Sequence, residues 1–305
     1  MTEETGNPGI FLSVRKAVIL SFAFGVVTGI LIGVTVTGIT DNNDLDPLEA
    51  ELEDSPDGDT PSEDTEPSAG ETEDQEPGTA EPDSDLEEIN TELPYDVGVG
   101  FGSEDVEWDG NTVSLEGAPR LGDADADVTI VSYEDFFCPF CAAYNNREVA
   151  QQLDANTAFS DIAENYIETG DVQYYFRQLP VVGGEISAEA HECVAEQEDS
   201  EAYWIFHHEH FDNFEQLRDL AETNPAEYES TMVEWSDQLG LDTEEYEQCL
   251  DEDRSQIEVS NQAQEGQSLG AQATPTVFID GEMVEGAQPY TAFQTVIEDK
   301  LADAN

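Results

Sequence analysis

The chain has 305 residues, and 72 acidic residues outweigh 8 lysines and arginines, giving a formal net charge of -64. This length corresponds to one or two domains. So strong a negative charge repels phosphates, which argues against nucleic acid and anionic lipid surfaces as partners.

The acidic residues also crowd the part of the chain that is expected to fold, for example residues 185–201 and 222–253. In dilute buffer this charge should repel itself and destabilise the compact state. At molar salt the Debye length is about 3 Å, so the repulsion is screened. The composition therefore predicts that low salt loosens the fold.

The first predicted element is an apolar helix over residues 17–40, which contain no charged residue. Such a helix spans roughly 36 Å, enough for a bilayer core. Arg15 and Lys16 precede it and no basic residue follows until Arg120, so the positive-inside rule places the N-terminus in the cytoplasm. We expect a cytoplasmic segment 1–16, an uncleaved signal anchor 17–40 in the cell membrane, and a catalytic domain outside the cell. A cleaved signal peptide is the alternative.

Three glycines of this helix, Gly25, Gly29 and Gly33, repeat every four residues. Small residues at this spacing let two membrane helices approach closely, which makes a homodimer a candidate. Glycine is also common in membrane helices that do not associate.

Residues 41–100 are rich in acidic residues, proline, serine and threonine, with few aliphatic residues and no periodicity. Such a segment buries too little apolar surface to offset its ordering entropy. We expect a disordered acidic linker here, which tethers a folded domain at 101–305.

The predicted elements of the folded domain alternate between strands and helices. A hairpin turning at Asp109-Gly110 comes first, and a hairpin turning at Asp280-Gly281 comes near the end. The remaining predictions are a buried strand at 128–133, helices at 138–153 and 158–168, a strand at 172–177, a helical block at about 187–269 and a terminal helix from Tyr290. This order indicates an α/β fold with an inserted helical block.

The most informative motif is Cys138-Pro139-Phe140-Cys141, which follows the buried strand and opens a helix. This context is typical of a redox-active cysteine pair. The helix start should lower the pKa of Cys138, the attacking cysteine, while Cys141 lies deeper as its partner. The alternatives are a structural disulfide or half of a zinc site, although zinc would require a second closely spaced pair.

Several motifs in order resemble the DsbA-like family of thiol–disulfide oxidoreductases, which has a thioredoxin-like fold. The resemblance covers about residues 115–302 and is carried by the segments 117–122, 128–131, 135–141, 190–193, 247–250, 270–281 and 286–289. It implies a cis bond between Thr274 and Pro275, beside the cysteine pair, where the backbone could pair with a substrate peptide. It also implies that Pro139 and Phe140 neighbour the reacting sulfurs, and no cofactor is expected.

Two residues depart from the pattern of the family. Ser132 lies six residues before the first cysteine, where many relatives have a buried acid, and Glu134 and Asp135 are therefore candidate proton-transfer aids. The alternative is that both are solvated loop carboxylates. Phe140 replaces the histidine of the best-known members and offers neither positive charge nor a hydrogen bond, which predicts a weaker oxidant.

Two further groups of residues lie in the helical block. Cys193 and Cys249 should form a structural disulfide in an oxidising compartment, and two buried free thiols are the alternative. The histidines at 191, 207, 208 and 210 could in principle ligate a metal. The aromatic residues around them favour an ordinary amphipathic helix, so no metal site is expected.

The resemblance implies an enzyme that introduces disulfides into reduced or misoxidised exported proteins. A membrane redox partner of DsbB-like or VKOR-like type would recycle it. The alternatives are a disulfide reductase or isomerase, for example in cytochrome maturation, and a non-catalytic binding module. The acidic composition resembles that of proteins from halophilic archaea.

Overall fold

The computed structural model describes Leu86 and residues 88–304 of the chain. The predicted cytoplasmic segment 1–16, the signal anchor 17–40 with Gly25, Gly29 and Gly33, and the linker as far as residue 85 lie outside the described residues. Among the residues that are described, no helix combines the length and apolar character needed to cross a membrane. The anchor and the dimer therefore stay predictions.

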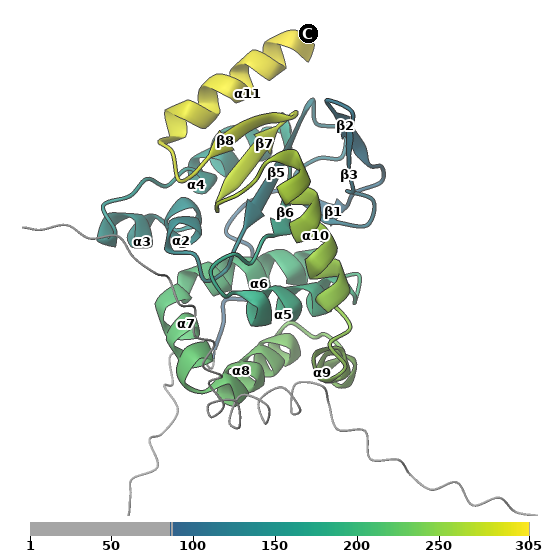
Figure 1. Cartoon of the computed structure of the whole chain (residues 1–305), viewed down its shortest axis with the longest axis vertical. Helices are drawn as coiled ribbons and strands as arrows, with labels where there is room; N and C mark the ends of the chain where they lie inside the picture. The colour runs from purple at the N-terminus through teal and green to yellow at the C-terminus, as the bar shows by residue number, and fades with distance from the viewer. Residues whose placement is uncertain (1–85, 87, 305) are drawn as a thin grey trace, which may run out of the picture. The chain divides into compact units, whose positions relative to one another are not determined.

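A six-stranded sheet in the order β1-β4-β6-β5-β7-β8 lies at the centre of the fold (Figure 1). Its strands are β1 (Val99–Phe101), β4 (Pro119–Leu121), β5 (Val128–Glu134), β6 (Val172–Gln178), β7 (Thr276–Ile279) and β8 (Glu282–Glu285). Only the central pair β5 and β6 is parallel, and the other neighbours run antiparallel. Every residue of β5 is buried, as expected for a strand covered on both faces.

The two faces of β5 contribute to different hydrophobic cores. Val128 and Ile130 belong to the larger core, whereas Val131 and Tyr133 belong to a smaller core on the opposite face. Because side chains alternate along a strand, Ser132 and Glu134 point to the same face as Ile130. This face lies beneath the helix that carries the cysteine pair.

The helix predicted at 138–153 is two helices, α2 (Pro139–Asn145) and α3 (Arg147–Gln152). Asn146 separates them in an extended conformation, and its side chain accepts the backbone N–H groups of Glu148 and Val149. Asparagine is a strong helix N-cap, so this residue starts a second helix instead of continuing the first. The prediction of a single helix over residues 138–153 was therefore wrong.

The other predicted elements of the thioredoxin-like part are confirmed. The helix expected at 158–168 consists of α4 (Phe159–Ile162) and a wider turn, η1 (Ala163–Ile167), and the chain ends in α11 (Tyr290–Ala304). The first hairpin pairs β2 (Val106–Trp108) with β3 (Asn111–Val113), and it covers the smaller core together with the helix α10 (Gln256–Leu269). Both hairpins turn where Asp-Gly pairs adopt positive φ, as the sequence predicted.

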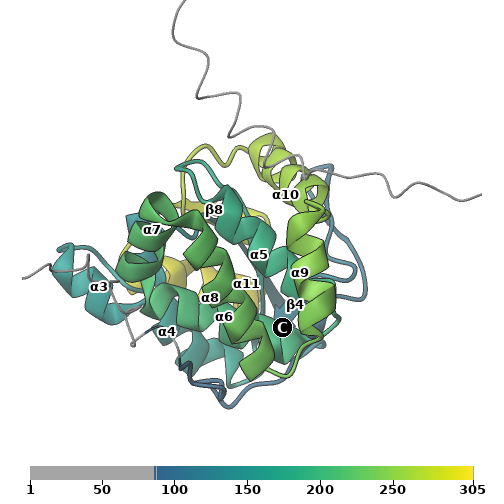
Figure 2. The same ribbon diagram turned by 90° about the horizontal axis from the view of Figure 1, so that it is seen from below.

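All but the last helix of the inserted block gather at one end of the folded domain, below the sheet in Figure 1 and toward the viewer in Figure 2. Its helices are α5 (Glu185–Ala195), α6 (Ser200–Asp212), α7 (Phe214–Thr223), α8 (Pro225–Gln238), α9 (Thr243–Asp251) and α10 (Gln256–Leu269). The insertion lies between β6 and β7, and α10 returns the chain to the sheet beside β6 and α5. The thioredoxin-like fold with a helical insertion is therefore confirmed.

The predicted linker extends too far, because Leu86 and residues 88–98 pack against the folded domain as an N-terminal strap. The indole N–H of Trp235 donates to the backbone oxygen of Leu86 at 2.8 Å, and the ring of Tyr95 lies edge-on to Phe159 at 5.8 Å. Leu93 and Val97 also pack on the larger core. The apolar side chains of the strap are sufficient to pack it against the domain. The sequence did not indicate this, because acidic residues dominate the composition of the whole segment 41–100.

Candidate functional site

The two cysteines of the redox motif lie where β5 ends and α2 begins. Cys138 is the residue that precedes the helix, and Pro139 occupies the first turn. Proline suits this position because its missing N–H would have no partner inside the helix. Both thiols are free, and Cys138 is only 4% exposed while Cys141 is fully buried.

The pKa of the Cys138 thiol is lowered to about 6. The largest cause is a hydrogen bond with the thiol of Cys141. Burial opposes this, whereas the Thr274 side chain and the backbone N–H groups of Cys141 and Phe140 favour the thiolate. Cys138 is therefore mostly ionised at neutral pH, the form in which a thiol attacks disulfides or departs from them.

Cys141 has the opposite shift, since its pKa is raised well above the ordinary value. Burial is the main cause, and the hydrogen bond to Cys138 and the nearby Glu134 add to it. A negative charge on Cys141 is thus disfavoured. The arrangement assigns the reactive thiolate to Cys138 and a protonated thiol to Cys141.

The Thr274–Pro275 peptide bond is cis, and it lies beside the cysteine pair. The Cys138 sulfur is 3.4 Å from the backbone oxygen of Thr274, although 136 positions separate the two residues. Pro275 directly precedes β7, so the fold brings the N-terminal end of this strand to the helix that carries the cysteines. The site residues inferred for this loop therefore meet the redox motif in space.

Glu134 lies fully buried beneath the site, within a set of polar groups from three elements. Its carboxylate accepts hydrogen bonds from Ser132 Oγ at 2.6 Å, Asn145 Nδ2 at 2.6 Å and Tyr174 OH at 3.2 Å. The same Asn145 amide donates to the backbone oxygen of Cys141 at 3.0 Å. Burial raises the pKa of Glu134 to about 7, while the three hydrogen bonds oppose the rise. Glu134 can therefore gain or lose a proton near neutral pH.

Asp135 has a different role, because its carboxylate binds backbone groups. Oδ1 accepts the N–H of Phe137 at 2.8 Å, and Oδ2 accepts the N–H of Val182 at 2.7 Å. Its backbone oxygen accepts the N–H of Cys138 at 3.0 Å. Neither candidate acid is a solvated loop carboxylate, since Glu134 and Asp135 are both buried.

Two of the residues that hold Glu134 escaped the sequence analysis. Asn145 is four residues after Cys141, so helical spacing places both on one face of α2, and this signal was available. Tyr174 comes from the neighbouring strand β6, and only the parallel pairing of β5 with β6 brings it close. No local pattern indicates that contact.

Cys193 and Cys249 form a disulfide between α5 and α9, with their Cα atoms 5.8 Å apart. The bond lies inside the helical block, among buried residues of the larger core. The structure thus contains the pairing that the sequence favoured.

Three of the four histidines surround Phe136, the residue two before Cys138. The ring of His191 stacks on Phe136 at 3.6 Å, and His210 and His207 lie at 4.7 and 5.8 Å. All three are buried, and burial lowers their pKa values, that of His191 to about 3. Among the described residues no group of histidine, cysteine and acidic side chains could hold a metal ion. These histidines act as neutral core residues.

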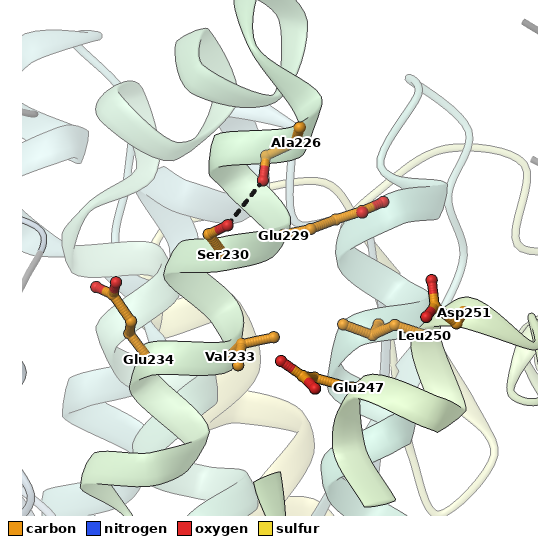
Figure 3. Close-up of a pocket in the computed structure, with 8 residues that line it drawn as sticks. All are labelled: Ala226, Glu229, Ser230, Val233, Glu234, Glu247, Leu250 and Asp251. Atoms are coloured by element: carbon orange, nitrogen blue, oxygen red, sulfur yellow. Dashed lines mark hydrogen bonds between the residues drawn. The ribbon is translucent and has the colours of Figure 1, made fainter. Parts of the chain in front are cut away.

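A surface hollow of about 440 Å³ lies between α8 and α9 (Figure 3). The residues that line it include Glu229, Glu234, Glu247 and Asp251. It contains no thiol and belongs to the helical block, so the redox site is elsewhere.

Comparisons with known proteins agree with this geometry. Residues 114–299 match a protein-family model described as thioredoxin. Disulfide bond formation protein D of Bacillus subtilis is 28% identical over 200 residues, which cover 62% of this chain and 79% of that protein. The oxidised crystal structure of BdbD from Bacillus subtilis has a TM-score of 0.51 at 24% identity, covering 65% of this chain and 100% of that one. The crystal structure of alpha-DsbA1 from Wolbachia pipientis has a TM-score of 0.50 at 23% identity, covering 63% of this chain and 94% of that one. At these identities the two crystal structures show a shared fold.

Proposed function

The chain belongs to the thioredoxin family and is a DsbA-like thiol–disulfide oxidoreductase, and on this premise we propose that it forms disulfides in exported proteins outside the cell membrane. The observation that carries the proposal is the contrast between the two cysteines. Cys138 has a pKa of about 6, whereas that of Cys141 is raised well above the ordinary value. A stable thiolate is a good leaving group. A disulfide that contains Cys138 is therefore readily reduced, and the substrate thiols become a disulfide in exchange.

The reaction begins with the Cys138–Cys141 disulfide. A substrate thiolate attacks the Cys138 sulfur, a bond forms between them, and Cys141 leaves as a thiolate that takes up a proton. A second substrate thiolate then attacks the substrate sulfur of this mixed disulfide, and Cys138 leaves as a thiolate. Two electrons pass from the substrate to the cysteine pair, and the substrate gains one disulfide.

Glu134 is proposed to supply the proton that Cys141 takes up. A thiolate on buried Cys141 is costly, and the pKa of Glu134, raised to about 7, leaves much of the carboxyl protonated at neutral pH. Asn145 donates to Glu134 and to the backbone oxygen of Cys141, and the charge of Glu134 is near enough to raise the pKa of the Cys141 thiol. Asp135 binds backbone N–H groups and has no such role.

The backbone of Thr274 is proposed to pair with the substrate segment beside the attacking cysteine. Its oxygen lies 3.4 Å from the Cys138 sulfur, so a peptide joined to that sulfur must pass close to it. Backbone pairing of this kind holds a peptide without reading its sequence. That suits an enzyme with many substrates.

Membrane anchoring and recycling belong to the same proposal. The uncharged segment 17–40, with Arg15 and Lys16 before it, supports a single-pass anchor with the cysteines on the outer side. A membrane redox partner of DsbB-like or VKOR-like type would reoxidise the pair, and reduced exported proteins are the substrates. A homodimer through Gly25, Gly29 and Gly33 remains a proposal of the same kind.

The proposal is tested with the oxidised full-length chain in molar salt and a reduced, unfolded test protein. We expect loss of substrate thiols, and none with Cys138→Ser. When Cys141→Ala is given a test protein that contains disulfides, the Cys138 thiolate should attack one of them, release one substrate thiol and stay trapped in a mixed disulfide. A matched control replaces both Cys193 and Cys249 by serine, which removes the other cysteine pair and leaves the redox motif intact. Its rate per folded molecule should stay close to that of the parent.

The direction of electron flow has its own test. A redox titration, combined with the redox state of Cys138 in cells, separates an oxidase from a reductase or isomerase. A pair that is mostly reduced in cells would contradict disulfide formation. No thiol loss in the test protein, with the chain folded, would instead favour a binding module.

A further inference from the structure

A buried tyrosine of β6 reaches the carboxyl group that lies beneath the redox site. Tyr174 is fully buried, and its hydroxyl donates to Glu134 Oε1 at 3.2 Å. Ser132 donates to the same oxygen, and Asn145 donates to Oε2. Of these three donors, Tyr174 alone comes from the neighbouring strand.

A tyrosine suits this position because its side chain is long. In the parallel pairing of β5 with β6, Tyr174 lies opposite Ile130, and Glu134 is four residues further along β5. At about 3.3 Å per residue this offset is roughly 13 Å along the strands. The ring must therefore extend along the sheet before its hydroxyl meets the carboxyl group. A serine or threonine at this position would be too short to make the contact.

Aromatic neighbours from two helices fix the ring of Tyr174. Phe159 of α4 lies 5.0 Å away between ring centroids, and Trp204 of α6 lies edge-on at 6.0 Å. A fully buried ring in a close-packed core has little freedom to move. Because α6 belongs to the helical insertion, the position of the hydroxyl depends on the insertion as well as on the sheet.

We propose that Tyr174 is a positioning residue for proton transfer between Glu134 and Cys141, and that its hydroxyl keeps the buried carboxyl group in place and able to ionise. This inference rests on the proposed function, in which the proton passes from the Glu134 carboxyl to the Cys141 thiolate. The transfer leaves a thiol at Cys141 and a carboxylate at Glu134. That carboxylate must persist in the core until it regains a proton from solvent, and a hydrogen bond from Tyr174 stabilises it.

The first test measures the pKa of Glu134 in Tyr174→Phe, which loses the hydroxyl and keeps the ring. The hydrogen bond opposes the rise that burial causes, so its loss should raise this pKa further above about 7, by about one pH unit. Carbon-13 NMR of the carboxyl group in the oxidised full-length chain measures it, and Glu134→Gln identifies the signal. Tyr175→Phe is the matched control, because Tyr175 donates to Gln173 and belongs to the smaller core. It should leave the pKa of Glu134 unchanged.

The rate of mixed-disulfide formation gives a second measurement. At each pH the rate of Tyr174→Phe is divided by that of the parent, so the ionisation of the substrate thiol cancels. At pH 6 Glu134 is mostly protonated in both, and the variant should be about tenfold slower because its acid is less well placed. Between pH 6 and pH 9 the ratio should rise about tenfold, since a higher pKa keeps more of the carboxyl protonated. A merely structural defect would lower the ratio equally at every pH.

A double variant, Glu134→Gln with Tyr174→Phe, assigns the effect to Glu134. Compared with Glu134→Gln alone, loss of the hydroxyl should give a rate ratio that does not depend on pH. A pH-dependent ratio in this background would overturn the proposal. It would indicate that Tyr174 acts through other titratable groups around Glu134, which are Cys138, Cys141, Tyr144 and Tyr203.

The outcomes separate the two proposals. An unchanged Glu134 pKa in Tyr174→Phe, or a rate ratio that is the same at every pH, overturns the positioning role while the redox function stands. If the folded parent oxidises no substrate thiol, the proposed function itself fails, and a role for Tyr174 in proton transfer fails with it.

Discussion

Cys138 and Cys141 are two residues apart, yet their pKa values shift in opposite directions. The sequence suggested that the helix start would lower the pKa of Cys138. In the structure the largest cause is the hydrogen bond from the Cys141 thiol, and backbone N–H groups of the helix start come after it. The second cysteine therefore tunes the first before any disulfide forms.

Removing the Cys141 thiol should raise the pKa of Cys138. A hydrogen bond to a charged group contributes roughly 1.5–3 kcal/mol, so Cys141→Ala should raise this pKa from about 6 by about one to two units. Cys141→Ser keeps a hydroxyl donor and should retain most of the lowering. The pH dependence of iodoacetamide alkylation measures both. Equal pKa values in the two variants would show that the helix start, and not the thiol, stabilises Cys138.

Hydrogen bonds from neighbouring side chains hold the carboxyl group of Glu134 in position. Ser132 lies six residues before Cys138, and its hydroxyl donates to Glu134 two residues further along the same face of β5. The alternation of side chains along a strand makes this possible. The Glu134 carboxyl therefore lies on the face of β5 that α2 covers.

Glu134→Gln should slow the formation of the mixed disulfide by about a hundredfold, the lower end of the range for acid–base catalysis. Stopped-flow mixing of the oxidised variant with a reduced substrate measures the rate. Glu265→Gln is the matched control, because Glu265 accepts from Tyr133 on the opposite face of β5. An unchanged rate in Glu134→Gln would exclude Glu134 as the proton donor.

The same variant separates chemistry from stability. The pKa of Glu134 is raised in the folded state to about 7, so the folded state binds this proton more tightly than the unfolded state does. The stability that the group contributes is present below about pH 4.5 and is lost as the pH rises to about 7. Glu134→Gln should therefore be more stable than the parent at pH 8. If Glu134→Gln reacts more slowly than the parent and yet is more stable, unfolding cannot explain its lower rate.

At the scale of elements, α5 and α6 bring three neutral histidines against Phe136, two residues before Cys138. His210 has no hydrogen-bond partner for either ring nitrogen among the described residues. Burial lowers its pKa, and the nearby His191 and His207 add to the effect. Protonation of these rings is therefore incompatible with the packed core.

The buried histidines predict loss of stability in acid. Their pKa values are lowered in the folded state, so their contribution is present above about pH 6.5 and is lost as the pH falls below it. Each such histidine changes the free energy of unfolding by about 1.4 kcal/mol per pH unit. His210→Leu should lower the pH dependence of the free energy of unfolding just below pH 6.5 by this amount, as urea unfolding at constant molar salt would show. A parallel slope in parent and variant would contradict the assignment.

The strap is a packed segment that the sequence analysis assigned to the linker, because acidic residues dominate the composition around it. Its residues Leu93, Tyr95 and Val97 alternate with exposed residues, but acidic residues dominate the composition of the whole segment 41–100. Its partners come from the helical block and from α4, for example Trp235 for Leu86 and Phe159 for Tyr95. Because it contacts both parts of the domain, the strap joins the insertion to the thioredoxin-like part.

At the scale of the whole molecule, negative charge dominates. Within residues 88–304 the few basic side chains already have partners, for example Arg254, whose Nη1 lies 2.7 Å from Glu245. Most acidic side chains must therefore be screened by dissolved cations. This links stability to ionic strength more than to any single ion pair.

We expect the thermal midpoint of unfolding to fall when salt is lowered from molar to millimolar concentration. The Debye length grows from about 3 Å at 1 M to about 30 Å at 0.01 M, so repulsion extends over the whole domain. Circular dichroism at increasing temperature measures the midpoint. Sucrose at equal osmolality is the control, and it should not replace the salt. An identical midpoint in both salt conditions would contradict this expectation.

The sequence alone determined the features that depend on neighbouring residues. A strand, the Cys138–Cys141 motif and a helix follow one another within a few residues, and the two Asp-Gly turns specify their hairpins locally. The helical insertion was visible for the same reason. The break at Asn146 was missed, because a good capping residue inside a helical pattern is hard to distinguish from a tolerated one.

Only the tertiary structure decided which distant groups meet at the site. Glu134, Asn145 and Tyr174 come from β5, α2 and β6, and the Thr274 oxygen approaches Cys138 from a different strand end. The parallel pairing of β5 with β6, and the position of β7 beside β5, create these contacts. Hydrogen bonds and burial depend on distance in space. The candidate redox cysteines therefore followed from the sequence, while their pKa values and the contacts of Glu134 required the fold.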